Sequence, residues 1–222
     1  MMNKMKLMGI FVIIAVFGIF SKTAIARPST NDYGDLPDSY KTLMSSDGAR
    51  HSNGTYEWFG EMSPDYDFDG QPNFDATGDN INGVNDEDGV KFYNSYVDIL
   101  VSVSDWRSGR YSSQGLLYVD GWFDWNNDGD FSEVDEHQIS FTANPTAWGQ
   151  NSAVYREYVH YDEDYSSRFR VSYNEGANNY FGAKSWGEVE DYKTEVPPVP
   201  EPSTLLLLGC GVLGLFGAHK RK

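Results

Sequence analysis

Cysteine is almost absent from this chain, and the single cysteine, Cys210, lies in an apolar run close to the last residue. The domain that precedes this run therefore has no disulfide and no catalytic thiol. Basic residues are also scarce, with 17 Lys and Arg against 33 Asp and Glu. An excess of acids this large argues against a partner that is nucleic acid or anionic lipid, and it favours divalent cations or simple solubility.

Several enzyme motifs are missing as well. The sequence has no G-x-S-x-G elbow, no H-E-x-x-H pair and no glycine-rich phosphate loop, and His51, His137 and His160 lack zinc-ligand spacing. We therefore expect a protein that is not an enzyme. A glycoside hydrolase is the less favoured alternative, because that chemistry needs only two carboxylates at the right separation.

The N-terminus has the parts of a secretory signal. A short basic stretch precedes an apolar run over residues 7–20, and Ala24 and Ala26 satisfy the small-x-small rule of signal peptidase. We expect residues 1–26 to be a signal peptide with a helical apolar segment. A permanent N-terminal anchor is the alternative, but the run is short for a span of roughly 20 residues.

The other end of the chain reads VPEPSTLLLLGCGVLGLFGAHKRK. Pro200, Glu201 and Pro202 lead into an apolar run over 205–218, which a basic cluster follows. The prolines stop a helix from entering the upstream domain, and the cations stay on the cytoplasmic side of a membrane. A helix of this length spans only about 21 Å, against about 30 Å of hydrocarbon, which suits a transient anchor.

This tail, within residues 196–222, resembles a PEP-CTERM sorting signal, the kind that an exosortase cuts in Gram-negative bacteria. The resemblance implies export across the inner membrane and transient anchoring there by a short transmembrane segment, 205–218. It also implies exosortase as a partner and a final location at the cell surface or in the extracellular matrix. Proteins with this signal are associated with exopolysaccharide-rich surfaces and biofilm matrix.

The chain between the two signals is acidic but rich in aromatic residues. Six of the 17 basic residues and one of the 33 acids lie in the signals, so residues 27–198 hold 11 basic and 32 acidic residues, a net charge of −21. Such a charge is typical of disorder, yet 30 of the 34 aromatic residues remain to build a core. We expect one domain over 55–195, preceded by a largely irregular lead-in over 27–54.

Alternating apolar and polar residues predict strands in this domain. The clearest rows are Val97, Ile99, Val101 and Val103; Leu117, Val119, Gly121 and Phe123; and Phe169, Val171 and Tyr173. Weaker rows lie at 55–59, 136–142, 153–161 and 188–194, and no stretch keeps a helical period. Short alternating strands between Gly, Asn and Asp turns predict an all-β fold, an antiparallel β-sandwich of immunoglobulin-like or jelly-roll-like form. The signal helix and a C-terminal hydrophobic helix would flank it.

One acidic loop, residues 124–136, has the spacing of a calcium site. Asp124, Asn126 and Asp128 alternate and are followed by glycine, as in the first half of the D-x-[DN]-x-[DN]-G loop. Ca²⁺ takes six to eight hard oxygen ligands, which such alternation turns to one side. Asp130 could add a ligand, and Asp135 holds the twelfth position, which Glu133 or Glu136 could replace. The flanks predict strands, so we do not expect an EF-hand; the alternative is a metal-free acidic turn.

Two further acidic segments offer weaker candidates for calcium. Asp65, Asp67 and Asp69 repeat the alternation, and a third cluster groups Asp79, Asp86, Glu87 and Asp88. Acids this close repel one another unless a cation or water intervenes. The alternative is a solvated acidic turn in each case. The three loops could share one site.

Seven ordered segments carry a second family resemblance. They are DYGDLPDSY (32–40), GARH (48–51), DGQP (69–72), TGDNINGVNDEDGV (77–90), GWFDWNNDGDF (121–131), RFRVS (168–172) and GEVEDY (187–192). Together, over 32–194, they resemble the GEVED domain of bacterial secreted and surface proteins. The resemblance implies an extracellular β-sandwich module and brings no catalytic residues.

The GEVEDY segment has two interpretations. Its acids Glu188, Glu190 and Asp191 could bind a metal ion. Alternatively, they pair with Arg168 and Arg170 on a neighbouring strand, as cross-strand charge pairs do in ordinary sheets. We favour the structural role.

These observations lead to a ranked expectation of function. We expect an exported, non-enzymatic surface or matrix module that Ca²⁺ stabilises, with no nucleic acid partner. The alternative is a carbohydrate-binding module for exopolysaccharide, in which Trp148, within a Pro-, Gly- and Asn-rich segment, is the best candidate for an exposed stacking ring.

Overall fold

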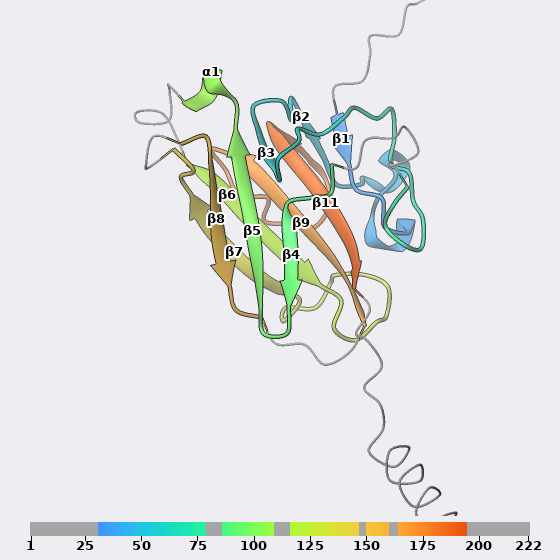
Figure 1. Ribbon diagram of the computed structural model, residues 1–222. Helices are drawn as coiled ribbons and strands as arrows, with labels where there is room; N and C mark the ends of the chain where they lie inside the picture. The colour runs from blue at the N-terminus through green and yellow to red at the C-terminus, as the bar shows by residue number, and fades with distance from the viewer. Residues whose placement is uncertain (1–30, 79–85, 109–115, 147–149, 160–163, 195–222) are drawn as a thin grey trace, which may run out of the picture.

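The computed structural model describes residues 31–78, 86–108, 116–146, 150–159 and 164–194, and almost all regular structure in them is β (Figure 1). The helical elements are two 3₁₀ turns, η1 (Asp38–Tyr40) and η2 (Met44–Ser46), and the short α1 (Asp105–Ser108). The strands are β1 (Asn31–Tyr33), β2 (Arg50–Ser52), β3 (Glu57–Phe59), β4 (Val90–Tyr93), β5 (Tyr96–Val103), β6 (Leu117–Phe123), β7 (His137–Ala143), β8 (Ser152–Glu157), β9 (Tyr165–Tyr173), β10 (Ala183–Ser185) and β11 (Gly187–Thr194).

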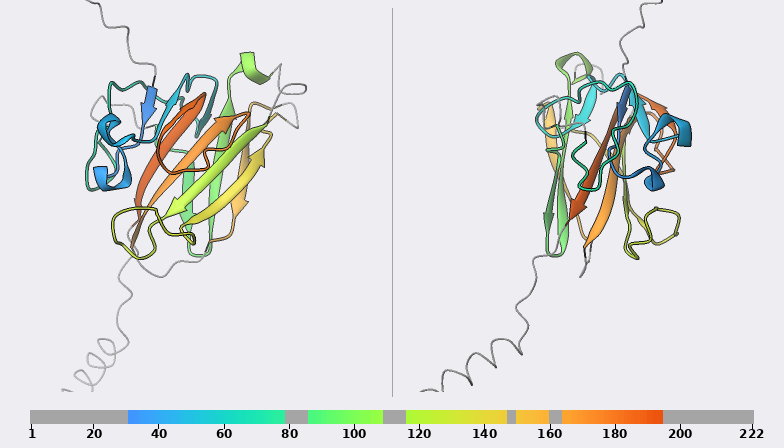
Figure 2. Two further views of the ribbon diagram at one scale, coloured as in Figure 1. Left: turned by 180° about the vertical axis from the view of Figure 1, so that it is seen from behind. Right: turned by 90° about the vertical axis from the view of Figure 1, so that its right-hand side faces the viewer.

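Two antiparallel sheets face each other, as the edge-on view of Figure 2 shows. The back sheet has the strand order β11-β9-β6-β7. The front sheet is centred on β5, which pairs with β3 and β4 along one side and with β8 along the other. The predicted all-β antiparallel sandwich is confirmed.

The two expected terminal helices, with the predicted transmembrane segment 205–218, lie outside the described residues. Within the part of the chain that is described, no helix has the length and apolar character needed to cross a membrane.

The main core lies between the two sheets, where the predicted rows point. The row of β5 is fully buried from Val97 to Val103, and its side chains meet Leu117, Val119 and Phe123 of β6 and Phe169 and Val171 of β9. Burying one side chain of this size contributes about 1.5–3 kcal/mol relative to leaving it exposed. The alternation in the sequence therefore places the core correctly.

Residues 31–54, which we call the covering segment, pack against the outer face of the back sheet at its β11 side (Figure 2). Where the sequence indicated a largely irregular lead-in, the structure adds β1, η1, η2 and β2, and β2 pairs in parallel with β10. Figure 2 shows this segment against the outer side of the back sheet. A second apolar cluster forms there from Leu36, Tyr40, Ala76, Trp122, Phe131 and Ala177.

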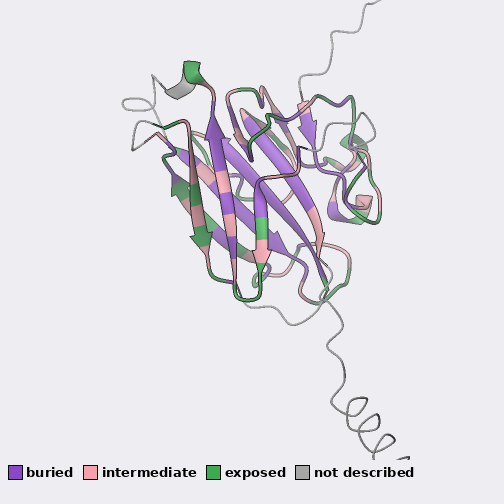
Figure 3. Cartoon of the chain, in the orientation of Figure 1, coloured by how far each residue is buried: buried purple, intermediate pink, exposed green. Residues whose placement is uncertain are grey.

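The two sheets therefore differ in their surroundings. Strand β9 is buried on both faces, from Tyr165 to Ser172, whereas the front sheet keeps exposed positions on β4 and β8 (Figure 3). Because β9 is buried on both faces, its polar side chains must find partners inside the protein. Those partners come from the covering segment, from β11 and from the backbone carbonyls of residues 179–182.

Candidate functional site

The loop over residues 124–136 connects β6 with β7 at one end of the sandwich (Figure 1). Its alternating side chains accept hydrogen bonds from backbone groups two residues further on. Asn126 Oδ1 accepts from the Asp128 N–H at 2.9 Å, Asp128 Oδ1 from the Asp130 N–H at 3.3 Å, and Asp130 Oδ1 from the Ser132 N–H at 2.8 Å. The backbone curls tightly as a result, with Gly129 at φ +95°, a value that suits glycine.

Asp124 anchors the start of this loop to the rest of the protein. Its carboxylate is fully buried and accepts hydrogen bonds from the N–H groups of Asp128 and Gly129 at 3.2 and 3.1 Å. The hydroxyl of Tyr40, at the end of η1, donates to the same carboxylate at 2.5 Å. Burial, followed by this contact with Asp124, raises the pKa of Tyr40. The covering segment therefore holds the first residue of the loop in place.

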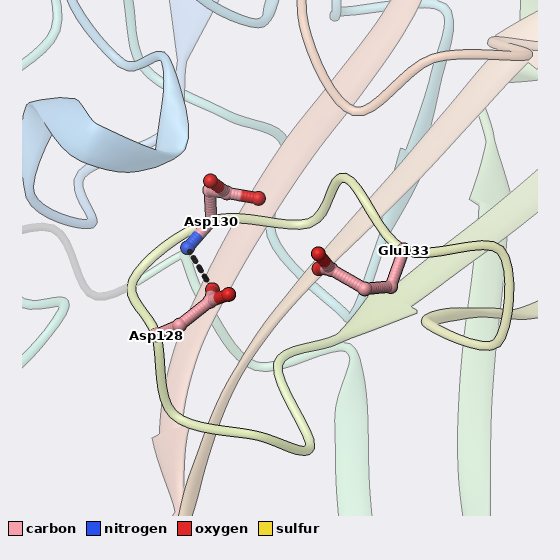
Figure 4. Close-up of side chains that lie close together, drawn as sticks. All are labelled: Asp128, Asp130 and Glu133. Atoms are coloured by element: carbon pink, nitrogen blue, oxygen red, sulfur yellow. Dashed lines mark hydrogen bonds between the residues drawn. The ribbon is translucent and has the colours of Figure 1, made fainter.

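Three carboxylates converge further along the loop. Asp128, Asp130 and Glu133 each place one oxygen within 4.8 Å of the others, and Glu133 points back across the loop toward the two aspartates (Figure 4). Oxygens that share one Ca²⁺ at 2.3–2.6 Å lie no more than about 5 Å apart. Among the described residues, this is the only group of three or more His, Cys, Asp or Glu side chains that meets the 4.8 Å limit.

Two buried carboxylate oxygens, one within this group and one beside it, have no hydrogen-bond donor in the described part of the chain. Glu136 is 1% exposed, and its Oε2 accepts from the Glu133 N–H at 3.2 Å. Glu136 Oε1 and Glu133 Oε2 are buried and accept no hydrogen bond from the part of the chain that is described. Burial, together with the neighbouring Glu133, raises the pKa of Glu136 to about 8. Buried carboxylate oxygens normally have partners, and a cation would supply one here.

Asp135, at the twelfth position, is exposed and does not belong to the convergent group. Glu133 belongs to that group instead, and a turn follows it in which the Glu136 N–H donates to Glu133 O at 3.2 Å. That an acid closes a metal site here stays a prediction. Asn126 lies beside the group, and its amide donates to Asp128 Oδ2 at 3.1 Å.

The alternating acids Asp65, Asp67 and Asp69 do not form a comparable group. Asp69 Oδ1 accepts hydrogen bonds from the backbone of Met44 and Gly70 at 2.6 and 2.9 Å, which joins this loop to the covering segment. Asp67 Oδ1 accepts from the Gln71 amide at 2.7 Å, and burial raises the pKa of Asp67 to about 6. A calcium ion at this loop stays a prediction.

Two of the three acidic segments meet in the structure. The Asp65 N–H donates to Asp86 Oδ2 at 2.8 Å, so the second loop adjoins the third cluster. Burial, with repulsion from Asp86, raises the pKa of Asp65. Asp79, the first acid of the third cluster, lies outside the described residues.

Asp191 of the GEVEDY segment forms a buried ion pair with Arg168 on the adjacent strand. Both side chains are fully buried, and the two carboxylate oxygens accept from Arg168 Nε and Nη2 at 2.7 Å each. Asp191 Oδ2 also accepts from the N–H groups of Asp35 and Leu36 at 2.8 and 2.9 Å. The expected pairing between β11 and β9 is present here, and it also ties down the covering segment.

Glu188 and Glu190 point to the opposite side of β11, where they hold the front sheet. Glu188 accepts from the backbone N–H of Phe59 in β3, and Glu190 accepts from the N–H of Gly89 at 3.1 Å and from the Tyr192 hydroxyl at 2.8 Å. Burial raises the pKa of both acids, that of Glu190 to about 8, and the pKa of Glu190 is raised further by Asp88 and Asp86. The acids of this segment thus serve as hydrogen-bond acceptors between layers.

Arg170 and His51 form a polar contact that the sequence pattern did not reveal. Both are fully buried, and Arg170 Nε donates to His51 Nε2 at 3.0 Å, while His51 Nδ1 lies 3.2 Å from Trp186 O. Burial, with the charge of Arg170, lowers the pKa of His51 well below its usual value. The neutral ring therefore accepts from the arginine and donates to the carbonyl. The only sequence signal was the placement of two arginines in alternation with core residues of β9.

The remaining predicted residues cannot be placed. Trp148, the candidate stacking ring, lies outside the described residues. The same holds for the cleavage residues Ala24 and Ala26 and for the sorting residues Pro200, Glu201 and Pro202.

Comparison with known proteins agrees with both family resemblances. The family model of the GEVED domain matches residues 118–195, which run from β6 to the end of β11. The PEP-CTERM protein-sorting motif matches residues 198–222, which include the Pro-Glu-Pro turn. Searches of curated proteins and of solved structures give no match. The chain therefore carries a GEVED domain over residues 118–195 and a PEP-CTERM sorting motif over 198–222, and the sorting motif implies processing by exosortase and a location at the cell surface or exterior.

Proposed function

We propose that this protein is an exported, non-enzymatic module of the cell surface or extracellular matrix, and that its 124–136 loop binds Ca²⁺. One observation supports the calcium site above all others. Oxygens of Asp128, Asp130 and Glu133 converge, and two buried carboxylate oxygens, Glu133 Oε2 and Glu136 Oε1, lack donors in the described structure. A divalent cation bound here neutralises the carboxylates, and their oxygens supply part of the six to eight ligands that Ca²⁺ takes.

In this proposal, bound Ca²⁺ raises the free energy of unfolding of the domain. The loop begins at Asp124, which Tyr40 of the covering segment holds, so an ordered loop also stabilises the contact between that segment and the back sheet. Extracellular calcium sites bind with a Kd of about 10⁻⁴–10⁻³ M. At ten times the Kd, binding to the folded state alone adds about 1.4 kcal/mol to the free energy of unfolding.

Two features support a role without catalysis. The three acids of the GEVEDY segment accept hydrogen bonds from backbone N–H groups, and Asp191 also accepts from Arg168. Asp69 likewise accepts from the backbone of Met44, so these acids keep few free lone pairs for substrate. The GEVED domain and the sorting motif are domain types that bring no catalytic residues. In this account the protein's partners are signal peptidase and exosortase during export, and the matrix afterwards.

Thermal unfolding of recombinant residues 27–198 tests the calcium site. Addition of Ca²⁺ at ten times the Kd should raise the melting temperature by about 3–6 °C relative to chelator. Asp128→Ala should abolish most of this gain. Asp135→Ala removes the same charge from an exposed position in the same loop and should keep the gain, which makes it the matched control. Identical melting curves with and without Ca²⁺ would contradict the proposal.

A further inference from the structure

A pocket of about 380 Å³ lies beside the 124–136 loop. Its walls come from three parts of the chain: the loop itself, the covering segment with residue 74, and strands β9 and β11. The residues that matter for its chemistry are Ser39, Phe74, Asp128, Ser166 and Lys193. The volume falls in the range of sites for small ligands.

Phe74 gives this pocket an exposed aromatic surface. Its side chain is 72% exposed, although a phenylalanine of this chain has a large apolar core available to it. An aromatic ring at the edge of a polar pocket can stack on the apolar C–H face of a ring-shaped ligand. The ring is therefore available for contact with a ligand in the pocket.

Lys193 supplies a cation that pairs with no acid in the described part of the chain. Its Nζ lies 3.4 Å from Ser166 Oγ and 5.8 Å from the centre of the Phe74 ring. Among the described residues it forms no ion pair within 4 Å, although acids greatly outnumber bases in this chain. The ammonium group keeps donors that can bind a ligand.

We propose that this pocket binds one unit of a neutral saccharide. The hydroxyl groups of a sugar both donate and accept hydrogen bonds, which suits a wall that combines the donor Lys193 with the hydroxyls of Ser39 and Ser166, which can do either. Phe74 stacks on the ring of the sugar. An anionic sugar fits less well, because Asp128 lies in the wall and the domain carries a large negative charge.

This inference goes beyond calcium binding and rests on it in one respect. The pocket shares Asn127, Asp128 and Gly129 with the proposed calcium loop, so an ordered loop also fixes one wall of the pocket. We therefore expect tighter saccharide binding in Ca²⁺ than in chelator. Phe74 and Lys193 lie outside the loop, which allows the two sites to be tested separately.

The test uses the full chain in a detergent without a sugar head group. Saturation-transfer NMR and calorimetry compare a panel of neutral gluco-, galacto- and manno-oligosaccharides with a uronic acid oligosaccharide of the same length, in Ca²⁺ and in chelator. We expect at least one neutral oligosaccharide to bind. Phe74→Ala should weaken it by about three- to tenfold, and Lys193→Met should weaken it as well.

Phe68→Ala is the matched control, because Phe68 is 71% exposed and does not line the pocket. It should leave binding unchanged. The proposal is overturned if no neutral oligosaccharide binds at millimolar concentration, if only the uronic acid binds, or if the two phenylalanine variants behave alike. Calcium titration of Phe74→Ala separates the two claims, since a normal calcium response with weakened saccharide binding supports the pocket and leaves the calcium site intact.

Discussion

Replacement of Asp191 by alanine should be one of the most destabilising single changes in this domain. The side chain is fully buried and accepts four hydrogen bonds, two from Arg168 and one each from the backbone of Asp35 and Leu36. Alanine removes all four acceptor contacts at once. The guanidinium of Arg168 then stays buried with carbonyl partners but without its counter-charge.

The expected loss in the free energy of unfolding follows from the burial of the ion pair between Asp191 and Arg168. Removal of one partner from a buried ion pair costs about 3–5 kcal/mol, because the remaining charge is desolvated and unpaired. The two backbone N–H groups that lose their acceptor add to this cost, though not independently. For a domain of this size, 3–5 kcal/mol lowers the melting temperature by roughly 6–20 °C.

The assay is urea unfolding of recombinant residues 27–198, with Asp98→Ala as the control. Asp98 also binds an arginine through two hydrogen bonds, at 2.7 and 2.8 Å to Arg156, but on the open face of the front sheet where water replaces the lost partner. The double change Arg168→Met and Asp191→Leu should recover part of the stability, because no buried charge remains. Equal losses for Asp191→Ala and Asp98→Ala would refute this reasoning.

Two further predictions concern β11. The pKa of Glu190 is about 8 in the folded state against 4.5 ordinarily, so the folded state binds more protons and stability should fall as the pH rises from about 4.5 to about 8. Glu190→Gln keeps an acceptor without the charge, and urea unfolding in chelator across this range should show a flatter profile; an unchanged slope would contradict the assignment. Gly187 has φ +125°, and an added Cβ would lie 1.8 Å from Val171 O. Gly187→Ala should therefore lower the free energy of unfolding by at least about 2 kcal/mol. Gly176→Ala should lower it much less, because the atoms nearest to its added Cβ lie at 3.3 Å. Similar unfolding midpoints for the two variants would contradict this prediction.

The sandwich could be predicted from the sequence because its core rows alternate cleanly. Val97 to Val103 and Leu117 to Phe123 place apolar side chains on one face, and the structure buries both rows between the sheets. The alternation of acids over 124–130 likewise indicated which loop gathers carboxylates, because side chains that alternate along a tight turn point to one side. Local periodicity was sufficient in both cases.

The covering segment could not be predicted, because its position depends on contacts between residues far apart in the sequence. Arg168 and Arg170 alternate with core residues and read as the polar, outward face of a strand. They are buried because residues 31–54 and the segment 179–182 fold over them and supply carbonyl partners. The spacing of the 124–136 loop pointed to Asp135 for a related reason, since spacing along the chain does not show that the folded loop brings Glu133, and not Asp135, next to Asp128 and Asp130.

Isothermal titration calorimetry with Ca²⁺ on recombinant residues 27–198 tests the central claim most directly. The account predicts a saturable heat with a Kd of about 10⁻⁴–10⁻³ M, present in Asp135→Ala and lost in Asp128→Ala. Absence of any calcium-dependent heat up to about ten times the upper value of that range would contradict the claim that the converging carboxylates of this loop hold a metal ion.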